Sequence, residues 1–234
     1  MKKLLVLALI AVLGIGCGAA RSLVGAAENT HVPEGAATAA PGGEGWTNLF
    51  ASEVAGKWIN VSNATPVEDV FELNEGVFHI FGKHETTYIA FDGDTFGDFE
   101  LHIEYKVADG TNSGVFFRSA KEDPVYKGFE IQVLEDHGEA PSKNSAGALY
   151  DVTTPMYNLS RPAGEWNSFD ITAQGGHLVV VMNGWKVVDT DISQMTMPIG
   201  KFPTPLATLP QTGHIILQDH GGEVWFKNLL VKKL

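Results

Sequence analysis

From position 46 onward the chain is a succession of short runs in which apolar and polar residues alternate. In residues 99–105 the odd positions are aromatic or aliphatic, and the even positions are acidic or histidine. Such alternation is typical of β-strands, because successive side chains of a strand point to opposite faces of a sheet. The pattern predicts strands at 77–81, 99–107, 114–118, 129–134, 168–172, 177–182, 185–188, 214–218 and 224–232.

Turn signals separate these runs, and no stretch of ten or more residues has a convincing helical period. Asn183-Gly184 between two apolar runs predicts a two-residue hairpin, and Asp92-Gly93-Asp94 predicts a further hairpin turn. Many short strands without helical crossovers indicate an all-β fold. We therefore predict a jelly-roll sandwich of two antiparallel sheets over residues 46–234.

The first 45 residues differ in composition from the rest. Residues 1–17 begin with two lysines after Met, continue with an apolar run too short to span a bilayer, and end at Cys17. Cys17 is the only cysteine and stands where bacterial lipoproteins are cleaved and lipidated, although Gly14 occupies a position where Leu is usual. Cleavage without lipidation is the alternative. Residues 18–45, rich in Ala, Gly and Pro, predict a flexible tether. Together these features predict export to the bacterial cell envelope, with membrane attachment only through a lipid on Cys17.

Charge and spacing exclude several classes of partner. The formal net charge is −12 and no basic cluster offsets it, which argues against a nucleic-acid partner. The histidines are scattered, so a zinc site is not predicted. Asp92-Gly93-Asp94 contains ligand types of a calcium loop, but Phe96 breaks the alternating ligand pattern. We predict no metal site and no cofactor, while a divalent metal and the oligomeric state stay open.

Two neighbouring runs carry the first candidate chemistry. Alternation in 114–118 and 129–133 predicts that Arg118, Glu130 and Gln132 share one face of a sheet, opposite an apolar face. Charged and amide groups on one face are costly to bury unless they pair or meet a ligand. A solvated outer face is the alternative interpretation.

Further segments combine polar and aromatic residues, as sugar sites do: rings pack on C–H faces, and amides, carboxylates and hydroxyls bind sugar hydroxyls. The candidates in these segments are Asp136, Tyr150, Trp166, Asn167, Gln218 and His220. Each has a structural alternative. Trp166 and Tyr150 could be core rings, and Asn167 and His220 could be turn residues.

Several short motifs follow one another in an order that resembles a known family. They are FEL (99–101), NSGVFFR (112–118), FEIQ (129–132), GALY (147–150), EWN (165–167), NG (183–184), QDHG (218–221) and FKN (226–228). Together they resemble the 3-keto-disaccharide hydrolase domain family over residues 45–234. The resemblance implies a concanavalin-like jelly roll, and members of this family are often exported by bacteria, some of them as lipoproteins.

The resemblance implies cleavage of glycosides whose C3 hydroxyl has been oxidised to a ketone, by C2 proton abstraction, elimination and rehydration. We expect Glu130 to act as the base, Arg118 to stabilise the enolate, and His220 or Asp136 to protonate the leaving oxygen. The sugar would be bound by Gln132, Tyr150, Trp166, Asn167 and Gln218. Two departures from the family pattern stand out: Lys227 occupies an expected Arg position, and the proline-rich loop 195–211 is longer than usual. This loop either covers the site or contacts a partner.

Other functions are compatible with the same fold, because fold does not fix function. One is a non-catalytic carbohydrate-binding module, and another is a structural or partner-binding surface lipoprotein. A catalytic site would have a carboxylate with a perturbed pKa in a polar cleft. A binding module would instead have a shallow face with exposed aromatic rings.

Overall fold

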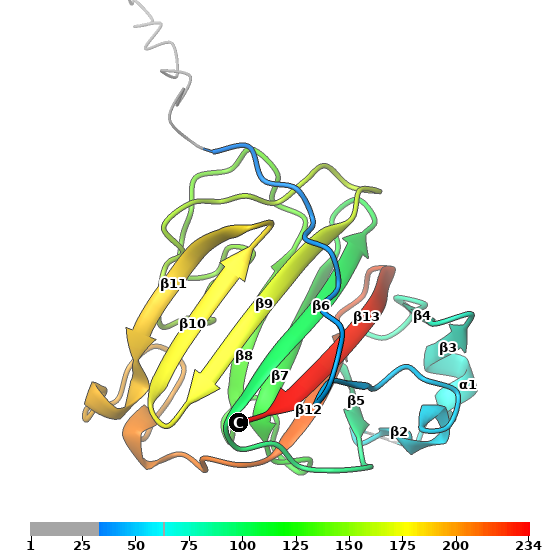
Figure 1. The fold of residues 1–234 in the computed structure, drawn as a ribbon, viewed down its shortest axis with the longest axis horizontal. Coiled ribbons are helices and arrows are strands. Elements are labelled where there is room, and N and C mark those ends of the chain that lie inside the picture. The colour runs from blue at the N-terminus through cyan, green and yellow to red at the C-terminus, as the bar shows by residue number, and fades with distance from the viewer. Residues whose placement is uncertain (1–32, 63) are drawn as a thin grey trace, which may run out of the picture. The chain divides into compact units, whose positions relative to one another are not determined.

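Antiparallel strands dominate the computed structural model, which describes residues 33–62 and 64–234 (Figure 1). The predicted signal peptide and Cys17 lie outside the described residues. Sheet A comprises β1 (Thr47–Asn48), β3 (Phe71–Asn74), β4 (Val77–Ile80), β6 (Phe99–Val107), β9 (Asn167–Gln174), β10 (His177–Met182), β11 (Trp185–Asp191) and β13 (Val224–Lys233). Sheet B comprises β2 (Trp58–Asn60), β5 (Thr87–Phe91), β7 (Asn112–Ser119), β8 (Phe129–Leu134) and β12 (His214–Asp219).

The strand order in sheet A is β11-β10-β9-β6-β13-β4-β3, with β1 also paired to β13, and the order in sheet B is β2-β5-β12-β7-β8. Helical turns in the described part are α1 (Val67–Val70), η1 (Ala55–Lys57), η2 (Ile192–Gln194) and η3 (Leu206–Thr208). None of these described helices is long and apolar enough to cross a membrane.

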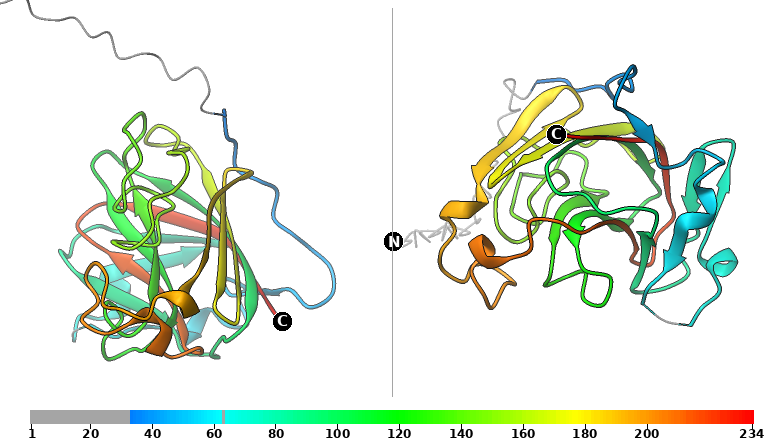
Figure 2. Two further views of the ribbon diagram at one scale, coloured as in Figure 1. Left: turned by 90° about the vertical axis from the view of Figure 1, so that its left-hand side faces the viewer. Right: turned by 60° about the horizontal axis from the view of Figure 1, so that its bottom comes forward.

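The two sheets pack face to face around an apolar core (Figure 2). On β6 the side chains of Phe99, Leu101 and Ile103 are buried in this core, as their alternation predicts. On β7 and β8 the same alternation buries Phe117 and Phe129, whose rings stack at 5.4 Å. The prediction of an all-β jelly-roll sandwich of two antiparallel sheets is confirmed.

The two turn predictions have different outcomes. Asn183 and Gly184 join β10 to β11, and both have positive φ angles (50° and 85°), as a tight hairpin with an Asn-Gly turn requires. Asp92-Gly93-Asp94 follows β5 of sheet B and leads to β6 of sheet A, so the hairpin predicted there is wrong. The carboxylates of this connection pair instead with Lys121 and Lys233.

Part of the predicted tether lies along the outer face of sheet A (Figure 1). The backbone N–H of Thr38 donates to Ser168 Oγ at 2.8 Å, and the Thr38 hydroxyl donates to Asp170 Oδ2 at 3.0 Å. Hydrogen-bonding side chains on β9 therefore bind this segment, and the described residues from position 33 onward are not a free linker.

Candidate functional site

The outer face of sheet B carries two of the predicted polar side chains around a glycine. Gly114 on β7 lies opposite Gln132 on β8. Its neighbour Val115 pairs with Leu217 on β12, so Gln218 lies on the other side of Gly114. The two glutamines therefore flank the same glycine, although they are 86 positions apart in the sequence.

Gly114 leaves space that the side chain of Glu130 occupies. Glu130 on β8 pairs with Phe116 on β7, one step along the same face. A Cβ atom at Gly114 would lie 2.6 Å from Glu130 Oε1 and 3.0 Å from Phe116 Cε2, closer than packed atoms allow. The absence of a side chain at Gly114 thus lets the Glu130 carboxylate lie over the middle of the face.

Both glutamines have a buried oxygen that lacks a partner. Gln132 and Gln218 are 3% and 5% exposed, and the Oε1 atom of each has no hydrogen-bond partner in the described part of the chain. Their Nε2 groups donate to Asn112 Oδ1 at 3.1 Å and to the Tyr88 hydroxyl at 3.3 Å. Buried polar atoms without partners are costly and uncommon in folded proteins. This arrangement favours a ligand that supplies the missing hydrogen bonds.

Glu130 forms a buried ion pair with a lysine that the sequence did not single out. The Lys201 ammonium lies 2.7 Å from Glu130 Oε2, and Glu130 is only 5% exposed. Burial raises the pKa of Glu130 above its ordinary value, while Lys201 and, more weakly, His220 oppose that rise. A carboxylate with a raised pKa that is held close to a cation is a suitable general base.

Lys201 reaches the site from the proline-rich loop between η2 and β12. Its ammonium lies 4.6 Å from the ring centre of Tyr150, 5.5 Å from that of Phe202 and 5.7 Å from that of Phe116. Phe202 is buried in the core and anchors the loop. The backbone N–H of Tyr150 also donates to the Glu130 carbonyl at 3.0 Å. The predicted site residue Tyr150 therefore lies beside Glu130, and the loop extends over this part of sheet B.

Apolar residues surround the polar centre of the face. Tyr88, Ala90, Phe116 and Ile216 form a small buried cluster on this side of sheet B, apart from the main core. Tyr88 is placed on β5 directly beside Gln218. His220 follows β12 and is exposed, so it lies at the open end of the face.

Arg118 does not belong to this face, and the prediction that it shares a face with Glu130 is wrong. Its backbone has a φ of 47°, and the pairing of β7 with β12 shifts register at this point, so the alternation is interrupted. The buried guanidinium donates to Gly97 O, Gly175 O and Gln211 Oε1 at 2.8 Å, and to Asp98 Oδ1 at 2.9 Å. A β-bulge has turned the side chain toward the β5–β6 and β9–β10 connections and the loop before β12.

Asp136 is bonded within the connection from β8 to β9. Asp136 Oδ1 accepts from the Ser160 hydroxyl at 2.7 Å, and Oδ2 accepts from the Ala146 N–H at 3.0 Å. Both carboxylate oxygens are therefore occupied, and the structure does not bring this predicted acid to Glu130. Its contacts indicate that it fixes the shape of the connection.

Asn167, a predicted sugar-binding residue, opens β9 of sheet A. Its Oδ1 accepts from Arg161 N–H at 2.9 Å and from Asn183 Nδ2 at 2.8 Å. The side chain is fully buried. Asn167 thus holds the β10–β11 turn against the neighbouring chain and does not face the site.

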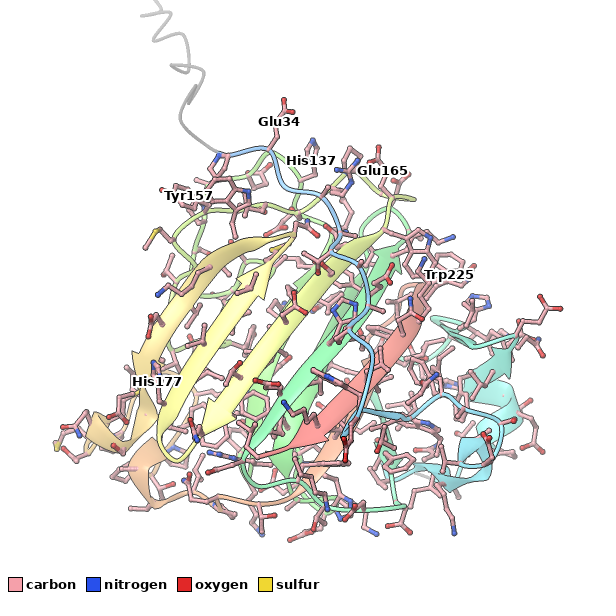
Figure 3. The ribbon with its side chains drawn as sticks, in the orientation of Figure 1. Glu34, His137, Tyr157, Glu165, His177 and Trp225 are labelled. Carbon is pink, nitrogen blue, oxygen red and sulfur yellow. The ribbon has the colours of Figure 1, made fainter. Side chains whose placement is uncertain are left out.

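Trp166 lies on the outer face of sheet A, on the opposite side of the sandwich. The ammonium groups of Lys227 and Lys106 lie 4.2 Å and 5.3 Å from its ring centre. Lys106 also lies over Trp225 of β13, which is labelled in Figure 3. Cations over the ring leave less of its surface for a sugar, and the ring lies away from Glu130.

Three members of the site were missed by sequence reasoning. Gly114 stands in the NSG motif, where a glycine flanked by strand residues signals a close approach of other atoms. Tyr88 precedes an apolar run and looks like an ordinary strand residue. Lys201 stands alone in a proline-rich loop, and no local pattern connects it to Glu130.

A hollow of about 520 Å³ lies between β1, β5 and β13, away from Glu130, lined by Leu49, Phe91, Phe96, Lys57, Lys233 and neighbouring residues. None of its lining side chains has a buried polar atom without a partner in the described ranges. Among residues 33–62 and 64–234, no group of three or more His, Cys, Asp or Glu side chains is placed to hold a metal ion. The candidate site is therefore placed at Glu130, where unpartnered amide oxygens from two different strands flank a buried carboxylate that is paired with a cation.

Comparison with known proteins agrees with this architecture. A model of the 3-keto-alpha-glucoside-1,2-lyase-like domain matches residues 45–232. A 3-keto-disaccharide hydrolase of Bacteroides thetaiotaomicron is 30% identical over 172 residues, which are 59% of this chain and 59% of that protein. The chain thus spans about three fifths of this relative's length.

Two crystal structures of candidate glycosyl hydrolases from Parabacteroides distasonis are similar to this chain. The first is 30% identical, with a TM-score of 0.69, and the match covers 81% of this chain and 99% of the other. The second is 23% identical with the same TM-score, and the match covers 81% and 94% of the two chains. At this identity the second structure supports the fold alone.

Proposed function

Because the chain belongs to the 3-keto-alpha-glucoside-1,2-lyase-like domain family, we propose that it cleaves glycosides whose C3 hydroxyl has been oxidised to a ketone. The family resemblance drawn from the sequence motifs is confirmed by this membership. The observation that carries the proposal is the buried Glu130 carboxylate over Gly114, with its raised pKa and its partner Lys201. The 3-keto-disaccharide hydrolase activity named for the Bacteroides relative supports the same chemistry.

A C3 ketone acidifies the proton on C2, so the reaction can begin with a base. Glu130 takes the C2 proton, and the electron pair of that C–H bond forms an enolate whose oxygen is at C3. Glu130 becomes neutral in this step, which frees the positive charge of Lys201 for the enolate oxygen. Lys201 thus takes the role that the sequence had suggested for Arg118.

The enolate then expels the oxygen on C1. The C1–O bond breaks, a C1–C2 double bond forms, the C3 ketone is restored, and the leaving oxygen takes up a proton. Water next adds its oxygen to C1, and the proton that it loses replaces the one taken up by the leaving oxygen. Glu130 returns its proton to C2, so the net change is hydrolysis. The unpartnered amide oxygens of Gln132 and Gln218 would accept hydrogen bonds from sugar hydroxyls.

The proposal is tested by incubating the purified protein with 3-keto-trehalose and with a 3-keto-glucoside, and following release of the second group. We expect turnover by the wild type and a loss of about 10²–10⁴-fold in kcat/KM for Glu130→Gln, the range for a general base. Full turnover by this variant would remove Glu130 from the mechanism. Binding of these substrates without turnover by the wild type would instead support a carbohydrate-binding module.

Glu104 supplies a matched control for this variant. It is a similarly buried carboxylate (7% exposed) that pairs with Lys227 at 3.1 Å, but on the outer face of sheet A. Glu104→Gln should leave kcat/KM unchanged. An equal loss in both variants would indicate damage to the fold and not to a reacting group.

A further inference from the structure

Resting on the proposed function, we propose that Tyr88 is the catalytic acid that protonates the leaving oxygen on C1. The reaction requires such a donor, because a sugar alkoxide is a poor leaving group. Of the two donors predicted from the sequence, Asp136 has both oxygens bonded within its own connection. His220 is exposed at the end of the face.

The register of sheet B directs the Tyr88 ring toward the reacting centre. Tyr88 on β5 pairs with Gln218 on β12, and Gln218 in turn lies beside Gly114 on β7. The Tyr88 ring packs edge-on against Phe116 of β7, with ring centres 5.5 Å apart and an interplanar angle of 88°. The ring therefore leans across β12 toward the strand that borders Glu130.

The hydroxyl of Tyr88 is held in place but keeps its proton for a ligand. Gln218 Nε2 donates to the Tyr88 oxygen at 3.3 Å. In the described ranges the Tyr88 O–H has no acceptor of its own. A phenol that accepts one hydrogen bond and still has a free donor is arranged to donate to a bound substrate.

The ordinary pKa values of a phenol and a carboxyl group assign the acid role to Tyr88 and the base role to Glu130. Burial raises the pKa of Tyr88; the bond from Gln218 lowers it, and the negative charge of Glu130 raises it further. Tyr88 therefore stays protonated at a pH at which Glu130 is ionised. Burial raises both pKa values, so the order of the two groups is the ordinary one, with the phenol as the acid and the carboxylate as the base.

The proton and electron movements balance in this step. The C1–O bond breaks with its electron pair going to the leaving oxygen, which takes the proton from the Tyr88 O–H. Tyr88 is left as a phenolate. The water that adds to C1 returns a proton to this phenolate, and Glu130 delivers its proton to C2, so both residues are regenerated.

The leaving group provides a direct test. A 3-keto-disaccharide releases a sugar alcohol that needs a proton, whereas a p-nitrophenyl 3-keto-glucoside releases a stable nitrophenolate that does not. For Tyr88→Phe we expect kcat/KM to fall about 100-fold on the disaccharide and to change by less than about 3-fold on the nitrophenyl substrate. The variant removes one hydroxyl and keeps the ring, so the packing on Phe116 is retained.

Two further variants complete the test. Tyr157, a partly buried tyrosine in the connection from β8 to β9 that packs against the main core, gives the matched control Tyr157→Phe, and both substrates should be turned over as by the wild type. An equal loss on both substrates in Tyr88→Phe would overturn the assignment and leave the proposed function intact. The assignment would also be overturned, with the proposed function intact, if His220→Gln lost activity on the disaccharide alone and Tyr88→Phe did not. If the wild type turns over neither substrate, both proposals fall.

Discussion

Glu130 and Arg118 are both buried charged side chains of sheet B, but the two regions around them differ in how completely they are hydrogen-bonded. All three nitrogen atoms of the Arg118 guanidinium donate to backbone or side-chain acceptors, at 2.8–2.9 Å. Glu130 has one charged partner, Lys201, and lies between two glutamines whose buried oxygens lack partners in the described residues.

This difference separates a structural cluster from a candidate site. A buried polar group without a partner lowers stability, so a region that keeps such groups is incomplete until something binds there. The region around Arg118 is complete by itself. Both regions contain a buried charged side chain, so neither burial nor charge distinguishes them. What distinguishes them is whether the buried polar atoms have hydrogen-bond partners.

The largest effect should come from removing the guanidinium of Arg118, whose region has its hydrogen bonds made within the protein. Arg118→Met leaves the acceptors Gly97 O, Gly175 O and Gln211 Oε1 without this donor and removes the charged partner of Asp98. We expect the free energy of unfolding to fall by about 3–5 kcal/mol, as when one partner of a buried charged network is lost. Denaturant unfolding measures this loss. The folded fraction should keep the wild-type kcat/KM, because Arg118 does not face the site.

Arg161 offers a matched control for this variant. It is a partly exposed arginine that pairs with Glu165 and donates to Gly35 O at 2.9 Å. Arg161→Met should lower the free energy of unfolding by less than about 1 kcal/mol. If Arg118→Met instead keeps the wild-type stability and loses activity, Arg118 acts in the site, and its region is not purely structural.

The sequence predicted the fold and part of the site, for identifiable physical reasons. Alternation fixes which residues of a regular strand share a face, so Glu130 and Gln132 were correctly predicted on one face of sheet B. At Arg118 a β-bulge breaks the alternation, and its positive φ leaves no mark in the residue types nearby. Lys201 reaches Glu130 from a loop 71 positions away, and only tertiary packing makes that contact.

The next effect concerns the cation of the incomplete region. Lys201→Met removes the charge proposed to stabilise the enolate, and we expect kcat to fall about 100-fold, which corresponds to about 2.7 kcal/mol. The variant should also change the pH profile. Lys201 lowers the pKa of Glu130 against the effect of burial, so its loss raises that pKa further. Glu130 acts as a base when ionised, and the acidic limb of kcat/KM should therefore move to higher pH.

Lys227→Met is the matched control, because Lys227 forms the corresponding ion pair with Glu104 on the outer face of sheet A. It should change neither kcat nor the acidic limb. If the acidic limb of kcat/KM does not move in Lys201→Met, the ion pair does not control the pKa of Glu130. The Glu130 region would then resemble the Arg118 region, with charges that only hold the structure together.

A smaller effect is expected from filling the space over Gly114. Gly114→Ala would place a Cβ atom 2.6 Å from Glu130 Oε1 and displace the carboxylate. We expect kcat/KM to fall about 10-fold, or about 1.4 kcal/mol, because small displacements of a reacting group are costly. Gly56→Ala is the control, since a Cβ there meets no atom within 4 Å. Equal activity in both variants would show that the position of the carboxylate is not restricted by Gly114.

The smallest effect is expected at Trp166, which the sequence suggested as a sugar-binding ring. Trp166→Leu keeps an apolar side chain but removes the ring beneath the Lys227 and Lys106 ammonium groups. We expect about 1 kcal/mol less stability and no change in KM or kcat. Trp185→Leu, at an exposed position of β11, should change neither stability nor kinetics. A raised KM in Trp166→Leu alone would show that substrate reaches the outer face of sheet A, and the incomplete region on sheet B would then not be the only part of the molecule that binds sugar.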